Sequence, residues 1–146
     1  DPDKHLILLR LYGVKAQRIL DEVGVLRSVI ILDYIAPAEM QYVDICVASL
    51  LPAWNHVCVP SKVVSAICYG LPVLYNANEE SEGACMFSDA IWLLPDTGNM
   101  SEIVSVFLDR LSVEKIAVKR KAAWRYSQEL LSMEQNNQSN LLKQIR

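Results

Sequence analysis

The chain has 146 residues, of which 52% are hydrophobic, and its formal net charge is −3. This length and composition suit one domain with a substantial core. The acidic balance excludes the broad positive field of a duplex-binding domain, so nucleic acid is not expected as the main partner. No apolar run approaches the ~20 residues that cross a bilayer, and the polar start DPDKH is unlike a signal peptide. The sequence therefore predicts a soluble, cytoplasmic protein.

Five apolar runs of strand length occur in the chain. They are rich in Ile, Leu and Val with little alternation, which is typical of strands that are buried on both faces of a parallel sheet. The runs cover residues 5–9, 28–34, 44–50, 72–77 and 90–95. Segments with helical spacing or turn character separate them, at residues 14–25, 38–43, 61–69 and 80–87. This alternation predicts an α/β fold, with a doubly wound (Rossmann-like), mostly parallel sheet flanked by helices.

After the last predicted strand the pattern becomes helical. Residues 101–111 carry an apolar stripe at helical spacing. A second helix is expected from Ser112 to about Leu131, and the polar stretch SMEQNNQSN precedes a final helical turn. We therefore expect a Rossmann-like domain at 1–112 and a C-terminal helical extension at 113–146.

A basic cluster, KRKAAWR, lies at residues 119–125 of this extension. We interpret it as a solvated helix face with Trp124 folded against the core. The alternative is a surface that touches a partner protein or the acidic inner face of a membrane.

The cysteines and histidines show no ligand or redox spacing. No C-x-x-C pair is present, and three of the four cysteines lie in apolar runs, where a thiol behaves as a small hydrophobe. The two histidines are isolated, and no carboxylate cluster is placed for Mg²⁺. We expect reduced thiols and no metal site. The residues concerned are Cys46, Cys58, Cys68, Cys85, His5 and His56.

The predicted helix at 61–69 begins with an unusual pair, Ser61 and Lys62. Pro60 disfavours helix at Val59 and fixes the entry, and Ser61 is expected to be the N-cap. Lys62 adds a positive charge beside the positive end of the helix dipole, which is unfavourable unless an anion offsets it. Backbone N–H groups, a hydroxyl and an ammonium at one spot make a phosphate site. The alternative is that Ser61 only caps and Lys62 only extends into solvent.

The position of this helix in the predicted sheet favours the anion site. The connection before it, residues 51–60, is long for a loop between a strand and a helix. In open parallel sheets, ligands bind beyond the carboxyl ends of the strands. Ser61 and Ser65 share one helix face, while the other faces are expected to pack through Val63, Val64, Ile67 and Cys68. Gly70 is expected to end the helix and Pro72 to begin the next strand.

Three segments in this order resemble the C-terminal half of GT-B fold glycosyltransferases, especially the large retaining group often called family 4. The segments are DICVASL, PSKVVSAICYGLPVLY and AIWLLPDTGNMSEIVSVFLDRL. Asp44 opens the strand, Pro60-Ser61-Lys62 opens the helix, Gly70-Leu71-Pro72-Val73 closes it, and Leu94-Pro95-Asp96 precedes the last matching helix. The likeness covers roughly residues 5–112.

The resemblance implies that this region binds a nucleotide-diphosphate sugar, without a cofactor and generally without a metal. Ser61 and Lys62 would hold the diphosphate, and Ser65 falls where the family's ribose-binding glutamate lies. The backbone around Tyr34 and Ile35 would border the base. The acceptor would be held by an N-terminal domain that this sequence lacks, so the chain alone is expected to bind the donor weakly and not to transfer the sugar.

The sequence also departs from the family pattern. Family members usually carry two glutamates eight residues apart, and the matching positions here are Val57 and Ser65. The usual glycine-rich loop is replaced by Asn78-Glu79-Glu80-Ser81, whose Glu79 and Glu80 could meet sugar hydroxyls or could be solvated. The alternative to a donor-binding domain is therefore a catalytically degenerate domain of this type that acts as a protein-interaction module.

Overall fold

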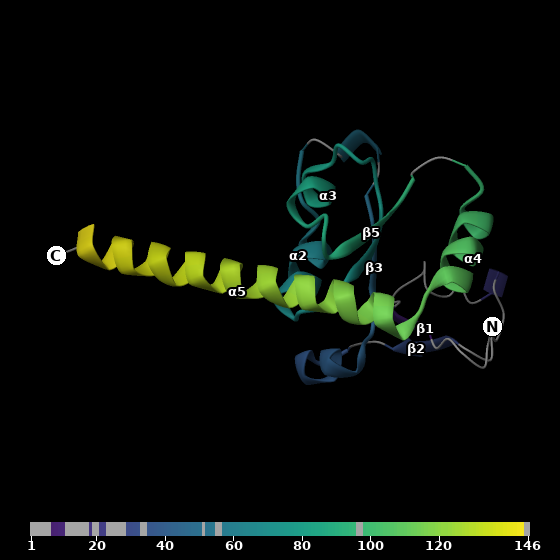
Figure 1. Ribbon diagram of the computed structural model, residues 1–146, viewed down its shortest axis with the longest axis horizontal. Helices are drawn as coiled ribbons and strands as arrows, with labels where there is room; N and C mark the ends of the chain where they lie inside the picture. The colour runs from purple at the N-terminus through teal and green to yellow at the C-terminus, as the bar shows by residue number, and fades with distance from the viewer. Residues whose placement is uncertain are drawn as a thin grey trace. The chain divides into compact units, whose positions relative to one another are not determined.

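The computed structural model describes residues 7–10, 18, 21–22, 29–32, 35–50, 52–54, 57–95 and 98–144. The chain divides into two compact units, Asp1–Met40 and Gln41–Arg146. Figure 1 labels most of their helices and strands. Each unit is described by itself below.

The first unit contains a parallel pair of strands. Strand β1, Ile7–Arg10, pairs with β2, Val29–Leu32, with Ile7 opposite Val29. Both strands lie within apolar runs predicted to be strands, apart from Arg10, which extends β1 by one residue. Between them, residues 18, 21 and 22 are helical, as predicted for 14–25, and the rest of that predicted helix lies outside the described residues. The 3₁₀ turn η1, Pro37–Tyr42, follows.

The second unit contains a three-stranded parallel sheet in the order β3-β4-β5. The strands are β3, Cys46–Ser49; β4, Val73–Asn76; and β5, Ile91–Leu94. The register aligns Cys46 with Val73, and Val73 with Ile91. The central strand β4 has three successive buried residues, Val73 to Tyr75, which explains why its sequence shows no alternation. All three strands were predicted.

Helices flank this sheet. They are α2, Ser61–Cys68; α3, Glu82–Met86; and α4, Met100–Arg110, with the short 3₁₀ turn η2 at Pro52–Trp54. Helix α2 packs against β3, β4 and α5, and its buried side chains are Val63, Ala66 and Ile67. Phe107 of α4 contacts Trp92 of β5 edge to face, with ring centroids 5.5 Å apart. The predicted α/β class, with a parallel sheet flanked by helices, is confirmed.

The C-terminal helix α5, Val113–Gln144, is one continuous helix of 32 residues. The prediction that it would end at about Leu131, before a separate final turn, was wrong. The polar stretch SMEQNNQSN contains neither Gly nor Pro, and Ser and Asn each cost only about 0.5–0.7 kcal/mol in a helix interior. That cost does not stop a helix whose first half is held by packing. Residues 131–137 are all exposed, and this half projects beyond the sheet (Figure 1).

Helix α5 lies along the amino ends of the three strands. Arg120 donates to the carbonyl of Val43, just before β3, at 2.6 Å. Ser127 Oγ donates to the carbonyl of Cys68, in the connection to β4, at 2.9 Å. Lys119 Nζ donates to the carbonyl of Ser88, just before β5, at 3.2 Å. Because the strands are parallel, their carboxyl ends lie together at the opposite edge, which α5 leaves uncovered.

Within the described part of the chain, no helix has both the length and the hydropathy to cross a bilayer.

Candidate functional site at the start of α2

The N-terminus of α2 lies at the carboxyl edge of the sheet, and its N-cap is one residue earlier than predicted. Pro60, with φ −58° and ψ 131°, is the N-cap, and Ser61 is the first helical residue, so the prediction that Ser61 caps the helix was wrong. The Pro60 carbonyl accepts from Val63 N at 2.9 Å. Proline has no side-chain acceptor, so no side chain caps the first turn. Within the described residues, the Ser61 and Lys62 amides therefore have no acceptor.

The three predicted site residues of α2 are on the surface. Ser61, Lys62 and Ser65 are all exposed, which agrees with the predicted polar face. The packing faces are only partly as expected, because Val63 and Ile67 are buried but Val64 is half-buried and Cys68 is exposed. Among the described carboxylates, none forms an ion pair with Lys62. The ammonium is thus free to meet an external anion.

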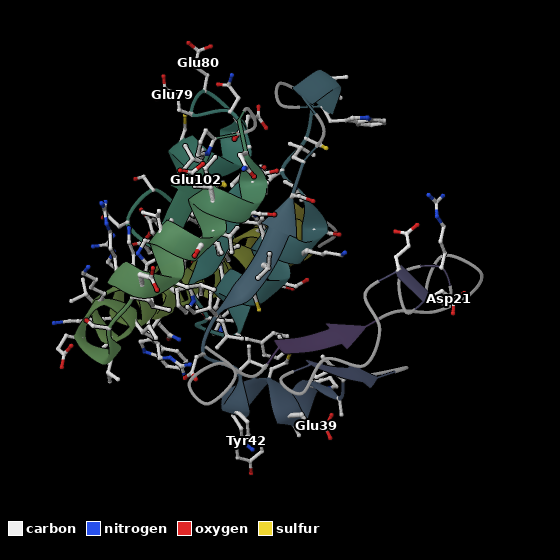
Figure 2. All side chains as sticks on the ribbon, turned by 90° about the vertical axis from the view of Figure 1, so that its right-hand side faces the viewer. Asp21, Glu39, Tyr42, Glu79, Glu80 and Glu102 are labelled. Carbon is white, nitrogen blue, oxygen red and sulfur yellow. The ribbon has the colours of Figure 1, made fainter. Side chains whose placement is uncertain are left out.

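The acidic residues Glu79 and Glu80 lie in the turn after β4, at the same edge of the sheet. Asn78 Oδ1 accepts from the Glu80 amide at 2.8 Å, and the Asn78 carbonyl accepts from Ser81 N at 3.1 Å, which fixes the turn. Both glutamates are exposed, and Figure 2 shows them at the outer end of the turn, pointing away from the fold. The structure favours solvated carboxylates over groups that close around a ligand.

The predicted border of the base-binding region belongs to the first unit, Asp1–Met40, and not to the unit that contains α2. Tyr34 lies outside the described residues. Ile35, which belongs to the first unit, is half-buried. Its predicted role beside a nucleotide base stays a prediction.

The carboxyl edge also holds a side chain that the sequence patterns did not single out. Asn76, the last residue of β4, donates through Nδ2 to the carbonyl of Pro95 at 2.8 Å. This bond ties the end of β4 to the residue that follows β5. The only sequence signal was an amide side chain at the end of an apolar run, which does not identify its acceptor.

Tyr75, the residue before Asn76 on β4, has a fully buried side chain. Its hydroxyl has no hydrogen-bond partner among the described residues. Burial raises the pKa of Tyr75, and the nearby Ser81 hydroxyl opposes that shift. The ring lies against Gly83 of α3, where a Cβ would come within 3.2 Å of Tyr75 Cε1.

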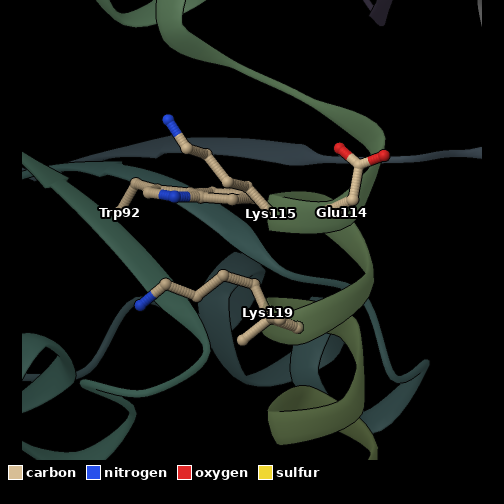
Figure 3. A pocket seen from close by; sticks show the side chains of 5 residues that line it. Trp92, Glu114, Lys115 and Lys119 are labelled. Carbon is tan, nitrogen blue, oxygen red and sulfur yellow. The ribbon is translucent and has the colours of Figure 1, made fainter.

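Two surface concavities of the described residues lie at the other edge, along α5, and not at the start of α2. Figure 3 shows the first, which is lined by Trp92, Glu114, Lys115, Val118 and Lys119. The second is lined by Asp89, Val118, Lys119, Lys121, Ala122, Trp124 and Arg125. Two of their three lysines already have partners, because Lys115 donates to the Arg110 carbonyl at 2.5 Å and Lys119 to that of Ser88. Burial lowers the pKa of Lys119, and the Asp89 carboxylate opposes this shift.

The basic cluster at 119–125 belongs to the same surface. Lys119 and Arg120 donate to loop carbonyls, and Arg125 pairs with Asp89 at 2.8 Å. Three of its four cations thus hold α5 to the strand-preceding loops. Trp124 is 59% exposed although one edge of its ring lies over Gly70, so the predicted packing of Trp124 against the core is only partial.

Within the described part of the chain, we find no candidate site for metal binding or thiol chemistry. No three His, Cys, Asp or Glu side chains gather there to hold a metal ion. All four cysteines are free; two of them, Cys46 and Cys58, are half-buried. Burial raises the pKa of Cys46, and Arg120 opposes this shift.

Comparisons of the chain with protein-family models, with curated proteins and with solved structures found no match. The likeness to GT-B glycosyltransferases therefore stays a prediction that rests on the motifs quoted above.

Proposed function

We propose that this chain is the donor-binding region of a GT-B type glycosyltransferase and that it holds the diphosphate of a nucleotide sugar at the start of α2. One observation carries the proposal. Ser61 and Lys62 are exposed at the start of α2, their amides have no acceptor within the described residues, and the Lys62 ammonium has no ion-pair partner there. Free amides and a cation at a helix N-terminus favour a phosphate group.

Each residue has a defined role in this proposal. The Ser61 and Lys62 amides, the Ser61 hydroxyl and the Lys62 ammonium would bind the diphosphate oxygens and stabilise the negative charge that grows on the leaving group. Ser65, one turn later on the same face, would meet the ribose in place of a glutamate. Glu79 and Glu80 would reach the sugar only if their turn moved toward α2. Transfer itself also requires a domain that binds the acceptor.

Calorimetric titration of the chain with UDP and with GDP tests the proposal. We expect weak binding of one nucleotide to the parent chain, and binding about tenfold weaker to Lys62→Ala, because one charge-assisted contact is worth about 1.5–3 kcal/mol before solvent screening. Lys121→Ala is the matched control, because Lys121 is exposed on α5 at the opposite edge. Equal affinities of the parent and Lys62→Ala would contradict the assigned role of Lys62.

The second candidate function is a catalytically degenerate domain that supports a partner protein. It is favoured by Val57, which stands where the family has a glutamate and is 67% exposed. Lys62→Ala separates the two candidates when sugar transfer and partner binding are both measured. An enzyme should lose sugar transfer while staying folded, whereas an interaction module should keep its partner.

A further inference from the structure

We propose that Lys119 is a nucleophilic lysine, and that the first concavity along α5 binds small aromatic aldehydes, which form an imine with the Lys119 Nζ. Lys119 lines both concavities of this surface and is half-buried. All the residues that line the two concavities belong to the second unit, Gln41–Arg146. The inference therefore concerns this unit by itself, and it does not depend on nucleotide binding at the start of α2.

A hydrogen bond fixes the position of the Lys119 amine. Nζ donates to the carbonyl of Ser88, just before β5, at 3.2 Å. This bond uses only an N–H group, so the lone pair of the neutral amine stays available to attack a carbonyl carbon. Ser88 thus positions the nucleophile without blocking it.

Burial favours the neutral, nucleophilic form of this amine. It lowers the pKa of Lys119 below the ordinary lysine value of 10.5, because a buried ammonium loses solvation, and the Asp89 carboxylate opposes the shift. Arg125 pairs with the same carboxylate at 2.8 Å, so Asp89 is shared between two cations. A lysine whose pKa is lowered by burial is the kind of lysine that forms Schiff bases.

The other charged groups around Lys119 are all on its own helix. Among the residues that line the two concavities, the contribution of β5 is the uncharged Trp92, and the loop before β5 contributes Asp89. The charged lining residues from α5 are Glu114, Lys115, Lys121 and Arg125. Cations therefore outnumber carboxylates near Lys119, which further disfavours a protonated amine.

The first concavity places an aromatic surface beside this amine. Its lining includes Trp92 and Val118, and in the view of Figure 3 the Trp92 ring lies between the Lys115 and Lys119 side chains. The edge-to-face contact with Phe107 helps to hold the ring in place, and a fixed indole is a surface on which another ring stacks. The volume of about 250 Å³ is below the roughly 300–1,000 Å³ of pockets for drug-sized ligands. This size favours a ligand with one aromatic ring.

Imine formation suits the groups that surround Nζ. The Nζ lone pair attacks the aldehyde carbon, and one amine proton moves to the aldehyde oxygen. That oxygen takes a second proton from solvent and leaves as water, so the step needs no oxidant or reductant. The protonated imine keeps a positive charge near Asp89 and one N–H for the Ser88 carbonyl. An acyl group would instead make Nζ a neutral amide, so the geometry favours an aldehyde over an acyl donor.

Reductive labelling of the whole chain with benzaldehyde tests the proposal. Sodium cyanoborohydride reduces each imine to a stable secondary amine, and peptide mass spectrometry quantifies the adduct at each lysine. At neutral pH we expect Lys119 to react about fivefold faster than Lys121, because its amine is less protonated and the ring stacks on Trp92. Lys121 is the internal control, as an exposed lysine of the same helix. Acetaldehyde cannot stack, so its preference for Lys119 should be smaller.

Two variants separate the stacking surface from the amine. Trp92→Leu removes the aromatic ring and keeps Lys119, so benzaldehyde should lose its advantage over acetaldehyde at Lys119. Lys119→Arg keeps the charge and removes the nucleophile, so the adduct at this position should disappear. Lys121→Arg is the matched control and should leave the Lys119 adduct unchanged. The comparison of the two aldehydes on the parent chain needs no variant, so the test holds even if Trp92→Leu fails to fold.

Three results would overturn the inference. Equal benzaldehyde rates at Lys119 and Lys121 would show that Lys119 has no special reactivity. A Lys119 that stays unlabelled in the whole chain would show that aldehydes do not reach the concavity. An equal preference for benzaldehyde over acetaldehyde at both lysines would exclude a binding surface on Trp92.

Discussion

One edge of the Trp124 ring, on α5, lies over Gly70, the second residue after α2. A Cβ at Gly70 would come within 2.9 Å of Trp124 Cε3, and Gly70 has φ +67°, in the left-handed region. Its amide donates to the Ile67 carbonyl at 2.8 Å and closes the helix. This one glycine therefore both ends α2 and lets α5 approach.

Gly70→Ala should destabilise the second unit for two reasons. The left-handed backbone costs a side-chain residue about 1 kcal/mol, and the contact with Trp124 adds about 1–2 kcal/mol of overpacking. We expect a fall of about 2–3 kcal/mol in the free energy of unfolding, measured by urea denaturation. Gly98→Ala is the control, because Gly98 has φ +100° but a Cβ there would lie 3.5 Å from Ile103 Cδ1. Equal losses for the two variants would contradict the close approach of Trp124.

Ser127 should contribute to the attachment of α5. Its hydroxyl is nearly buried and donates to the Cys68 carbonyl at 2.9 Å. Ser127→Ala leaves that carbonyl without this donor, so we expect the free energy of unfolding to fall by about 1 kcal/mol. Ser132→Ala, in the exposed part of the same helix, removes only a local bond to the Glu129 carbonyl and should change stability by less than about 0.5 kcal/mol. A larger loss for Ser132→Ala than for Ser127→Ala would show that α5 is attached in another way.

Lys62 should slightly destabilise the chain when no anion is bound. Its charge lies in the first turn of α2, beside the positive end of the helix dipole, and it is exposed. Lys62→Gln is therefore expected to raise the free energy of unfolding by about 0.3 kcal/mol at low salt, with the gain lost at high salt. Lys121→Gln, in the interior of α5, should show no such gain. If Lys62→Gln lowers stability at low salt, Lys62 has a structural role that excludes this account.

Tyr75→Phe should not destabilise the fold, because the Tyr75 hydroxyl is buried without a partner in the described residues. We expect the free energy of unfolding to be unchanged or to rise by up to about 1 kcal/mol at neutral pH. Tyr42→Phe, at an exposed position, is the control and should be neutral. A clear loss in Tyr75→Phe alone would mean that the hydroxyl is hydrogen-bonded in solution, for example through a buried water.

The burial of Tyr75 also predicts how the free energy of unfolding depends on alkaline pH. Burial raises the pKa of Tyr75 above its ordinary value of 10.0, so the fold favours the neutral phenol. The stabilisation from the neutral Tyr75 phenol is fully present below the pKa that Tyr75 has in the unfolded chain. It is lost as the pH rises through the raised pKa of Tyr75 in the folded chain. The parent chain should therefore lose stability above about pH 10 more steeply than Tyr75→Phe does. Identical profiles would contradict the raised pKa.

The strands could be predicted because each lies in a continuous apolar run, although only β4 is buried along most of its length, whereas Val47 of β3 and Leu93 of β5 are exposed. Continuous runs of Ile, Leu and Val mark β3, β4 and β5 without any knowledge of their partners. The position of α5 could not be predicted, because it depends on contacts between residues far apart in the chain. Arg120 and the Val43 carbonyl, for example, are separated by 77 residues. The predicted end of α5, at about Leu131, was also wrong. The polar residues that follow Leu131 are compatible with a helix, and neither Gly nor Pro occurs among them.

The candidate site was predictable in part. Pro60, Ser61 and Lys62 identified the start of α2 within one residue, because proline restricts the backbone locally. The sequence did not determine which residue is the cap, since Pro60 and Ser61 can both stand at a helix start. The sequence also did not determine where the Glu79 and Glu80 side chains point, because this depends on how Asn78 closes their turn.

Chemical-shift perturbation of the ¹⁵N-labelled chain tests the central claim most directly. With millimolar UDP or GDP, we expect the largest amide shifts at residues 59–66, above all at Ser61 and Lys62, with little change along α5. The absence of any shift there, or shifts confined to the α5 concavities around Trp92 and Lys119, would contradict a diphosphate site at the start of α2.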